Sequence, residues 1–294
     1  MIKIDKESCI NCTICYEICP DYVFSVDEVE KKDVTVRFAD HCCICGHCVS
    51  MCPIGAVTHD TLPCDDFVKI SKPEIKPLDL QNLIFSRRSV RKYKDKQVEK
   101  ETINQLIECA AHAGSAGNVQ TEGFIVLNDK SFLKKLELVV VDSLWHGGVK
   151  FFKGKGLIQK FLSKRFGAKL TYQYQKYHKL IVRRRENNEE EGMIFRNAPA
   201  VIAIHGLKAN YLAQTNSAIA LRNIELMAQT LGLGTCHVGF LVTASNMRTR
   251  KINKMLGLDN KRKIYGALMI GYPKYKYKHR IPKQDRKVNT MYSA

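Results

Sequence analysis

The sequence has no long apolar run. Its longest apolar stretches, at 138–141 and 201–204, are far shorter than the roughly 20 residues that a helix needs to cross a bilayer. The opening segment, residues 1–6, also lacks the apolar core of an export signal. We therefore expect no membrane association and a cytoplasmic location.

A dinucleotide-binding fingerprint is missing as well. The pattern Gly-x-Gly-x-x-Gly does not occur, and the nearest approach, Gly232-Leu233-Gly234, has no third glycine. It also follows a predicted helix, whereas the fingerprint requires a preceding strand. The sequence thus excludes a separate Rossmann domain.

The composition is that of a globular protein with room for two domains. Of the 294 residues, 45% are hydrophobic and 26% charged. Residues 1–60 hold five basic and ten acidic residues, a balance of −5, while the remaining chain holds 42 and 19, a balance of +23. An acidic module joined to a basic body suggests that the module docks on that body, or that the body attracts acidic partners.

Eight of the twelve cysteines form a repeated motif. The pattern Cys-x2-Cys-x2-Cys-x3-Cys-Pro occurs at 9–20 and again, with identical spacing, at 42–53. Such a loop wraps an iron-sulfur cube, and the fourth cysteine of each copy ligates the other cluster. We predict two [4Fe-4S] clusters, one held by Cys9, Cys12, Cys15 and Cys52 and the other by Cys42, Cys45, Cys48 and Cys19.

A structural zinc site is the alternative for these cysteines. A zinc site requires two Cys-x2-Cys pairs and has neither the third cysteine nor the trailing Cys-Pro of this motif, so we favour the clusters.

Metal-ligand spacing of the cysteines also indicates a reducing compartment. Cys43, Cys64 and Cys109 fall outside the motif, and we interpret them as buried or incidental thiols. Clusters of this class carry single electrons, so a second domain must supply the substrate chemistry.

Three segments follow from the periodicity. We predict a ferredoxin-like domain at 1–60, with short strands at 22–24 and 34–38, a linker at 61–78 that contains three prolines, and a domain of mixed helix and strand at 79–294. In the last we predict helices at 101–113 and 211–231 and strands at 124–127, 201–204 and 265–270.

Three further motifs lie in the second domain. Residues 87–93 place three arginines and a serine within five positions, a composition that binds phosphate. A solvated basic turn is the alternative for this motif taken by itself. Residues 114–120 form a small-residue loop that ends in Asn-x-Gln, and residues 231–239 contain Gly-Leu-Gly.

With these motifs in this order, residues 80–294 resemble the nitroreductase family of FMN flavoproteins, and the whole chain is similar to ferredoxin-nitroreductase fusions. The resemblance implies an α+β fold, with a nitroreductase-like α/β FMN domain after a small bacterial 2[4Fe-4S] ferredoxin-like domain. It also implies four groups of FMN contacts: Arg87, Arg88, Ser89 and Arg91 on the phosphate and ribityl chain; Ser115, Ala116, Asn118 and Gln120, from the partner subunit, on the ring; Val238 and Gly239 near N5; and Lys278 and Arg280, flanked by Pro282, on the phosphate.

The resemblance further implies an FMN- and iron-sulfur-dependent oxidoreductase that works as a homodimer. Electrons from ferredoxin, another low-potential donor or NAD(P)H would reach a nitroaromatic, a quinone or a similar conjugated acceptor. We expect no catalytic side chain, because the flavin carries the chemistry, and we interpret His237 as a packed histidine. Thr121 and Glu122 stand where the family often has Pro-Trp, so a dedicated metabolic substrate is an alternative.

The segment 150–185 has twelve basic residues and no acidic ones. A redox-sensing protein that binds polyanions is one reading of this segment, with Tyr172, Tyr174 and Tyr177 stacking on bases. Since these tyrosines are spaced as a helix face, we favour a solvated helical insert or a docking surface for an acidic module. We do not expect nucleic acid as a partner.

Overall fold

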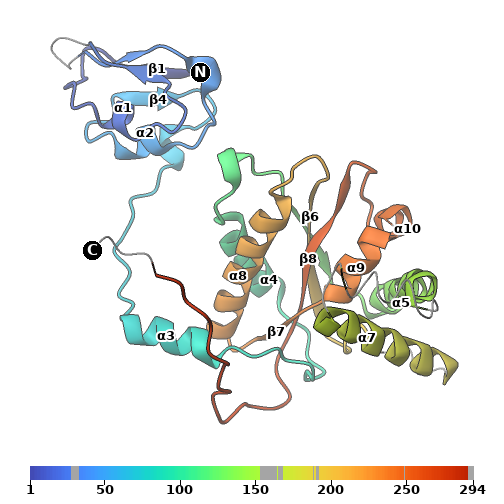
Figure 1. Ribbon diagram of the computed structural model, residues 1–294. Coiled ribbons are helices and arrows are strands. Elements are labelled where there is room, and N and C mark those ends of the chain that lie inside the picture. Colours follow the sequence, from blue (N-terminus) through green and yellow to red (C-terminus); the bar gives the residue numbers. More distant parts are fainter. Residues whose placement is uncertain are drawn as a thin grey trace. The chain divides into compact units, whose positions relative to one another are not determined.

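The computed structural model describes residues 1–27, 33–152, 164, 168–187, 189, 192–247 and 249–290 (Figure 1). The chain divides into two compact units, considered separately below. The N-terminal unit comprises 1–75 and 115–120, and the C-terminal unit comprises 76–114 and 121–294.

The N-terminal unit includes most of the predicted linker. The predicted tyrosine face and the basic insert lie partly outside the described residues. No helix in the described ranges is long and apolar enough to span a membrane.

The N-terminal unit is built from two similar halves. Strand β1 pairs antiparallel with β4, and β2 with β3, and each pair accompanies one short helix. Apolar side chains from all four strands pack with several cysteines in one small core. The elements are β1 (Ile2–Ile4), α1 (Ile14–Glu17), β2 (Phe24–Ser25), β3 (Thr35–Val36), α2 (His47–Met51) and β4 (Val57–His59), with 3-10 turns at Ala39–His41, Cys64–Asp66 and Ala116–Asn118.

The C-terminal unit is a four-stranded antiparallel sheet of order β5-β6-β8-β7, with helices on both faces (Figure 1). The predicted helices and strands of this domain are present, each with slightly shifted ends. The elements are α3 (Pro77–Ser86), α4 (Lys100–Ala111), β5 (Gly123–Leu127), α5 (Lys130–Phe152), α7 (Ala168–Glu186), β6 (Ala200–Leu207), α8 (Ala213–Thr230), β7 (Gly234–His237), α9 (Gly239–Met247), α10 (Thr249–Met255) and β8 (Arg262–Gly271).

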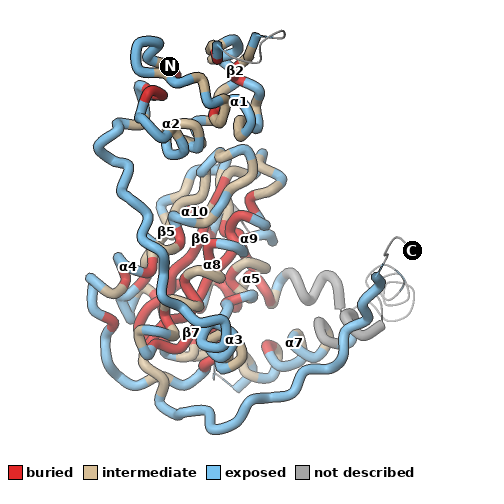
Figure 2. Tube along the Cα trace, turned by 90° about the vertical axis from the view of Figure 1, so that its left-hand side faces the viewer, coloured by how far each residue is buried: buried red, intermediate tan, exposed pale blue. Residues whose placement is uncertain are grey.

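The two-residue period of a strand explains why this sheet is covered on both sides. On β6, Ile202 and Ile204 face α4 and α8, whereas Val201 and Ala203 face α5, α9 and α10. Every residue from Ala200 to Ile204 is therefore buried, and the central strands form the red centre of Figure 2. Runs of consecutive apolar residues are usual in strands of parallel sheets. In this protein such a run forms β6, a central strand of an antiparallel sheet.

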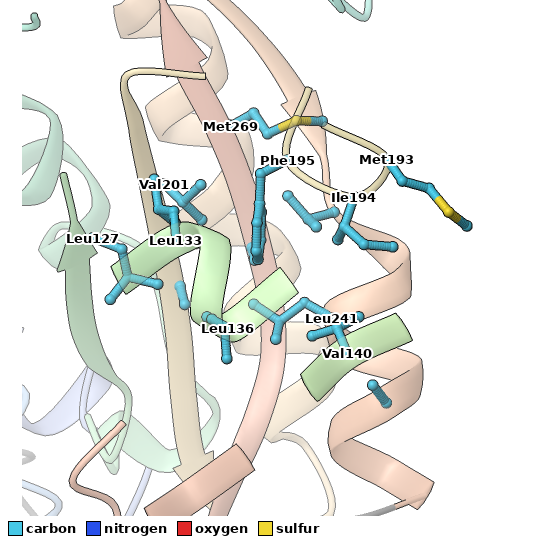
Figure 3. Close-up of a cluster of buried hydrophobic side chains, with 14 of the residues drawn as sticks. Leu127, Leu133, Leu136, Val140, Met193, Ile194, Phe195, Val201, Leu241 and Met269 are labelled. Carbon is cyan, nitrogen blue, oxygen red and sulfur yellow. The ribbon is translucent and has the colours of Figure 1, made fainter. Parts of the chain in front are cut away.

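One face of the sheet carries the larger core. In Figure 3, Leu133 and Leu136 of α5 lie beside Val201 of β6, and Phe195 lies between α5 and the sheet. The segment that carries Phe195 is irregular, so its backbone N–H groups need partners from outside a helix or strand. Buried Glu137 supplies them, accepting hydrogen bonds from the N–H groups of Gly192 at 2.8 Å, Ile194 at 2.5 Å and Phe195 at 3.1 Å.

We predict that Glu137→Gln lowers the free energy of unfolding of this unit by about 2 kcal/mol, because an amide NH2 cannot accept the hydrogen bond that one carboxylate oxygen accepts. Urea denaturation followed by fluorescence of Trp145, the single tryptophan of the chain, would measure the change. Glu108→Gln, at an exposed position on α4, is the control and should shift stability by less than about 0.5 kcal/mol. Equal midpoints for Glu137→Gln and the wild type would contradict the capping role.

Candidate functional site

Two pockets in the N-terminal unit collect the motif cysteines. One is lined by Cys9, Cys12, Cys15 and Cys52, together with apolar side chains such as Val34 and Val57. The other is lined by Cys19, Cys42, Cys45 and Cys48, and also by Cys43, which lies outside the motif spacing. Each pocket therefore contains three cysteines from one copy of the motif and the fourth from the other copy. These two sets have the same members as the two predicted ligand sets.

Main-chain N–H groups donate hydrogen bonds to two of the sulfurs, which stabilises negative charge on them. The main-chain N–H of Val23 donates to Cys19 Sγ at 3.4 Å, and that of Ala56 donates to Cys52 Sγ at 3.2 Å. Without metal, burial and the neighbouring thiols raise the pKa of Cys48 to about 12. Several partly buried thiols in one pocket are costly to ionise together, and cationic iron would offset that cost, so the residues fit an iron-sulfur cluster.

Each pocket brings four motif cysteines together, which fits a cluster with four thiolate ligands. All twelve cysteines are free of disulfides, as a metal-ligand reading requires.

The cysteines outside the motif have different surroundings. Cys43 lines the second pocket, and its main-chain N–H donates to Asp21 Oδ2 at 3.0 Å. Burial, followed by a hydrogen bond to Asp21, raises the pKa of Cys43 to about 12. Cys64 is exposed and Cys109 half-buried, so neither is a fully buried thiol.

The arginine segment of the C-terminal unit runs beside strand β7. Ser89 forms a parallel bridge with Thr235, and the N–H of Val90 donates to the Thr235 carbonyl at 2.9 Å. The approach is so close that a Cβ on Gly234 would lie 2.5 Å from Val90 Cγ2. Gly232 adopts φ 71° just after α8 and reverses the chain. The Gly-Leu-Gly motif therefore has a structural function: it turns the chain and lets β7 meet the arginine segment.

The C-terminal tail returns to the same place. Tyr277 Oη donates to the Ser89 carbonyl at 3.4 Å, and Arg88 Nη2 donates to the His279 carbonyl at 3.4 Å. The guanidinium carbon of Arg280 lies 3.6 Å above the ring of Phe85, at the end of α3. Two basic motifs almost 200 residues apart in the sequence thus meet in one region, which also brings Lys278 near the segment.

Arg88 shows that this region fits an anionic group. Its Nη1 donates to the carbonyls of Phe85 and Arg87, each at 2.8 Å. Its Nε is buried and has no hydrogen-bond partner in the part of the chain that the structure describes. A buried donor without an acceptor is costly, and a phosphate oxygen would satisfy it.

Sequence reasoning missed a buried carboxylate beneath the arginine segment. Glu225 of α8 is 5% exposed, and its carboxylate oxygens lie 3.1 Å from Arg87 Nη1, 3.4 Å from Arg222 Nη1 and 3.5 Å from His237 Nε2. Burial alone would raise its pKa, but His237 and the two arginines outweigh burial and lower it. The available signal was a glutamate on the otherwise apolar face of α8 that carries Leu221, Ile224 and Ala228.

The predicted contacts near the flavin N5 differ from each other. Val238 is buried, and its N–H already donates to the Ala267 carbonyl at 2.9 Å. Gly239 begins α9, and a Cβ there would meet no atom within 4 Å, so a ligand can approach the main chain at this position. His237 is the last residue of β7 and its side chain is 54% exposed, so it is not a packed histidine, although its Nε2 lies 3.5 Å from Glu225.

The small-residue loop belongs to the N-terminal unit. Gln120 is linked to Asn118 and Ser115, its side chain donating to Asn118 Oδ1 at 2.7 Å and its N–H to Ser115 Oγ at 3.1 Å. Asn118 Nδ2 donates to the carbonyls of Cys43 and Ile44 at 3.0 and 2.9 Å. Ala116 lies in the 3-10 turn between them. Packing of this loop on a flavin ring stays a prediction.

The residues that replace the usual Pro-Trp of the family are held by the C-terminal unit. Asn210 Nδ2 donates to Thr121 Oγ1 at 3.2 Å, and Arg262 Nη1 donates to the Thr121 carbonyl at 3.1 Å. Glu122 accepts from Asn216 Nδ2 of α8 at 2.8 Å. These two positions therefore have a supporting role in the sheet and helix layer.

The described part of the basic segment packs on the C-terminal unit. Ile181 of α7 is buried against the core that includes α5, and Tyr177 lies edge-on to Phe240 of α9 with ring centroids 5.4 Å apart. Tyr172 is exposed, and the side chain of Tyr174 lies outside the described residues. One tyrosine of the proposed stacking face is thus used for packing.

Comparison with known proteins agrees with both units. The model of the family described as "Nitroreductase family" matches residues 84–272, and that of the "4Fe-4S dicluster domain" matches residues 8–56. A putative NADH dehydrogenase/NAD(P)H nitroreductase of Archaeoglobus fulgidus is 26% identical over 65% of this chain and 84% of its own length. A ferredoxin of Thermococcus litoralis is 39% identical over 19% of this chain and 93% of its own length.

Solved structures agree on the fold. A nitroreductase with bound FMN from Bacteroides fragilis is 21% identical, with a TM-score of 0.52 over 74% of this chain and 98% of its own. A second, from Desulfitobacterium hafniense, is 20% identical, with a TM-score of 0.53 over 72% of this chain and 97% of its own. At this identity the likeness concerns the fold alone.

The exchange of fourth cysteines can be tested by one substitution. Cys19→Ala should remove or destabilise the cluster on Cys42, Cys45 and Cys48, although Cys19 lies in the other copy of the motif. Spectra of the reduced protein should retain one cluster, and Cys52→Ala should retain the other. If Cys19→Ala instead removed the cluster on Cys9, Cys12 and Cys15, each copy would bind its own cube and the predicted ligand sets would be wrong.

Proposed function

This chain belongs to the nitroreductase family and is a flavin oxidoreductase with an iron-sulfur module, and from that premise we propose the path of its electrons. A low-potential donor such as ferredoxin, or NAD(P)H, supplies them; they pass through the two [4Fe-4S] clusters to FMN and then to a nitroaromatic, a quinone or a similar conjugated acceptor. The observation that supports this path best is the presence, in one chain, of two cysteine-lined pockets and a basic region suited to a phosphate.

We assign a binding role to each basic residue of this region. Arg87, Arg88, Arg91, Lys278 and Arg280 provide the positive charge that a flavin phosphate needs, and arginine forks can bind it bidentately. Glu225 holds Arg87 in place from below and lies 3.5 Å from His237 Nε2, so both side chains are already oriented when the cofactor arrives. When bound, FMN supplies the redox chemistry, taking up single electrons and delivering a hydride equivalent.

The chain's own residues in this scheme bind and orient, and none acts as a nucleophile or general base. Positive side chains and N–H donors near the ring favour the anionic reduced flavin. The approach to the main chain at Gly239 is compatible with an N–H donor there. We also propose that the active form is a homodimer, as in the family that the sequence resembles.

Two classes of electron acceptor are candidates: nitroaromatics, quinones and similar conjugated compounds, or a dedicated metabolic substrate. Thr121 and Glu122 stand where the family often has Pro-Trp, and this difference favours a substrate specificity of its own. A dedicated metabolic substrate, with nitro reduction incidental, is therefore the second candidate. An anaerobic screen of nitroaromatics, quinones and other conjugated acceptors separates the two, since a dedicated enzyme should turn all model acceptors over slowly.

The composition of the purified protein tests the cofactors directly. Isolated without oxygen, it should contain about eight irons and one FMN per chain, and light scattering should give the mass of two chains. On stepwise addition of a reduced ferredoxin-type donor, cluster bleaching should precede flavin bleaching. A colourless protein, or a yellow one without iron and sulfide, would refute the proposal.

The role of Arg88 gives a sharper test. Arg88→Lys keeps the charge but removes the buried Nε donor and the planar fork, so we expect at least a tenfold weaker affinity for FMN. Titration of the flavin-free protein with FMN, followed by flavin fluorescence, measures the dissociation constant. Arg250→Lys, at an exposed position on α10, is the matched control and should bind FMN as the wild type does. Unchanged affinity in Arg88→Lys would exclude Arg88 from the phosphate site.

A further inference from the structure

One histidine lies against a cluster cysteine. His59, the last residue of β4, is 9% exposed and lines the pocket that contains Cys19, Cys42, Cys45 and Cys48. Its Nε2 lies 3.9 Å from Cys42 Sγ, a distance suited to an N–H···S hydrogen bond. The cysteine motif does not include this histidine, and the function proposed above does not use it.

The hydrogen bonds of the ring decide which nitrogen carries the proton. The main-chain N–H of Thr61 donates to His59 Nδ1 at 3.2 Å, and Thr61 Oγ1 lies 2.9 Å from the same nitrogen. Because Nδ1 accepts a hydrogen bond, the neutral ring carries its proton on Nε2. The N–H therefore points at Cys42 Sγ, and His59 is a donor to the sulfur.

The internal repeat supplies a built-in comparison. A shift of 33 residues relates Cys9 to Cys42, and the same shift relates Val26 to His59. Val26 is a half-buried residue of the core, and its apolar side chain cannot donate a hydrogen bond. The main-chain donors at Cys19 and Cys52, from Val23 and Ala56, obey the same shift, so they act equally on the two clusters.

The surroundings of Cys9 and Cys42 are opposite in polarity. Cys9 Sγ lies 3.6 Å from Asn11 Oδ1, and that oxygen is oriented by the N–H of Val34 at 3.3 Å. An acceptor oxygen therefore faces one sulfur. Cys42 Sγ has the His59 Nε2–H and, at 3.4 Å, the main-chain N–H of Ile44. Donors stabilise the added negative charge of a reduced cluster, whereas an acceptor does not.

We propose that His59 sets the two clusters at different reduction potentials, with the cluster on Cys42, Cys45, Cys48 and Cys19 the higher. One electron then leaves the reduced cluster on Cys9, Cys12, Cys15 and Cys52, which is oxidised, and enters the other, which is reduced, and no proton moves. His59 acts through Cys42 and gives electron flow within the module a direction. The inference concerns the clusters alone and does not depend on FMN or on the acceptor.

The test is His59→Val, which copies the residue of the other half of the repeat. An anaerobic redox titration of the full-length protein, followed by electron paramagnetic resonance, gives one midpoint potential per cluster. We expect the equilibrium constant for electron transfer from the lower to the higher cluster to fall about tenfold, or about 59 mV for one electron. The lower potential should stay unchanged. His41→Val, at an exposed position in the same half, should change neither potential.

A measurement on the wild type covers the case in which His59→Val loses iron. Protein labelled with 15N only in the imidazole rings of histidine should show a 15N coupling, in pulsed electron paramagnetic resonance, to the cluster that is reduced first. Main-chain nitrogens carry no label and cannot produce it. The proposal fails if the coupling is absent or belongs to the cluster reduced second, or if His59→Val keeps all its iron and both potentials. A retained redox difference with lost FMN binding would leave this inference intact while refuting the function proposed above.

Discussion

Burial of negative charge is the constraint on which this molecule depends. Glu225 beneath the arginine segment and Glu137 inside the larger core are removed from water, and the cluster thiolates are partly shielded from it. An isolated buried anion is too costly to be tolerated, so each must be met by a cation or by several N–H donors. The chain meets each anion differently: with main-chain N–H groups at Cys19 and Glu137, and with arginines and a histidine at Glu225.

The same constraint links the sheet to the candidate cofactor region. Helix α8 buries its apolar face on the sheet and thereby places Glu225 under the end of the arginine segment. Strand β7 joins the edge of the sheet, and its first residue must be glycine because Val90 packs directly on it. Packing of apolar side chains thus determines where the charged groups stand, and the charged groups in turn make the region suitable for a phosphate.

Most of the secondary structure was predictable from sequence, because its signals are local. The helix at 101–113 and the strand at 201–204 follow from apolar spacing, and both are present with small shifts at their ends. The role of Gly-Leu-Gly was less accessible. In the structure it is a helix end followed by strand β7, and the need for glycine at 234 arises from Val90, more than 140 residues away.

The repeated cysteine spacing by itself determined the nature of the metal centres, and four ordered motifs determined the family. Spacing suffices there because three of the four ligands of each cluster lie only a few residues apart and are placed by the local chain. Only the tertiary structure decided which side chains surround those motifs. Glu225 under Arg87, the tail beside Ser89 and His59 against Cys42 are contacts between distant segments, created by strand pairing and helix packing. No local pattern encodes them, because each depends on how the whole unit folds.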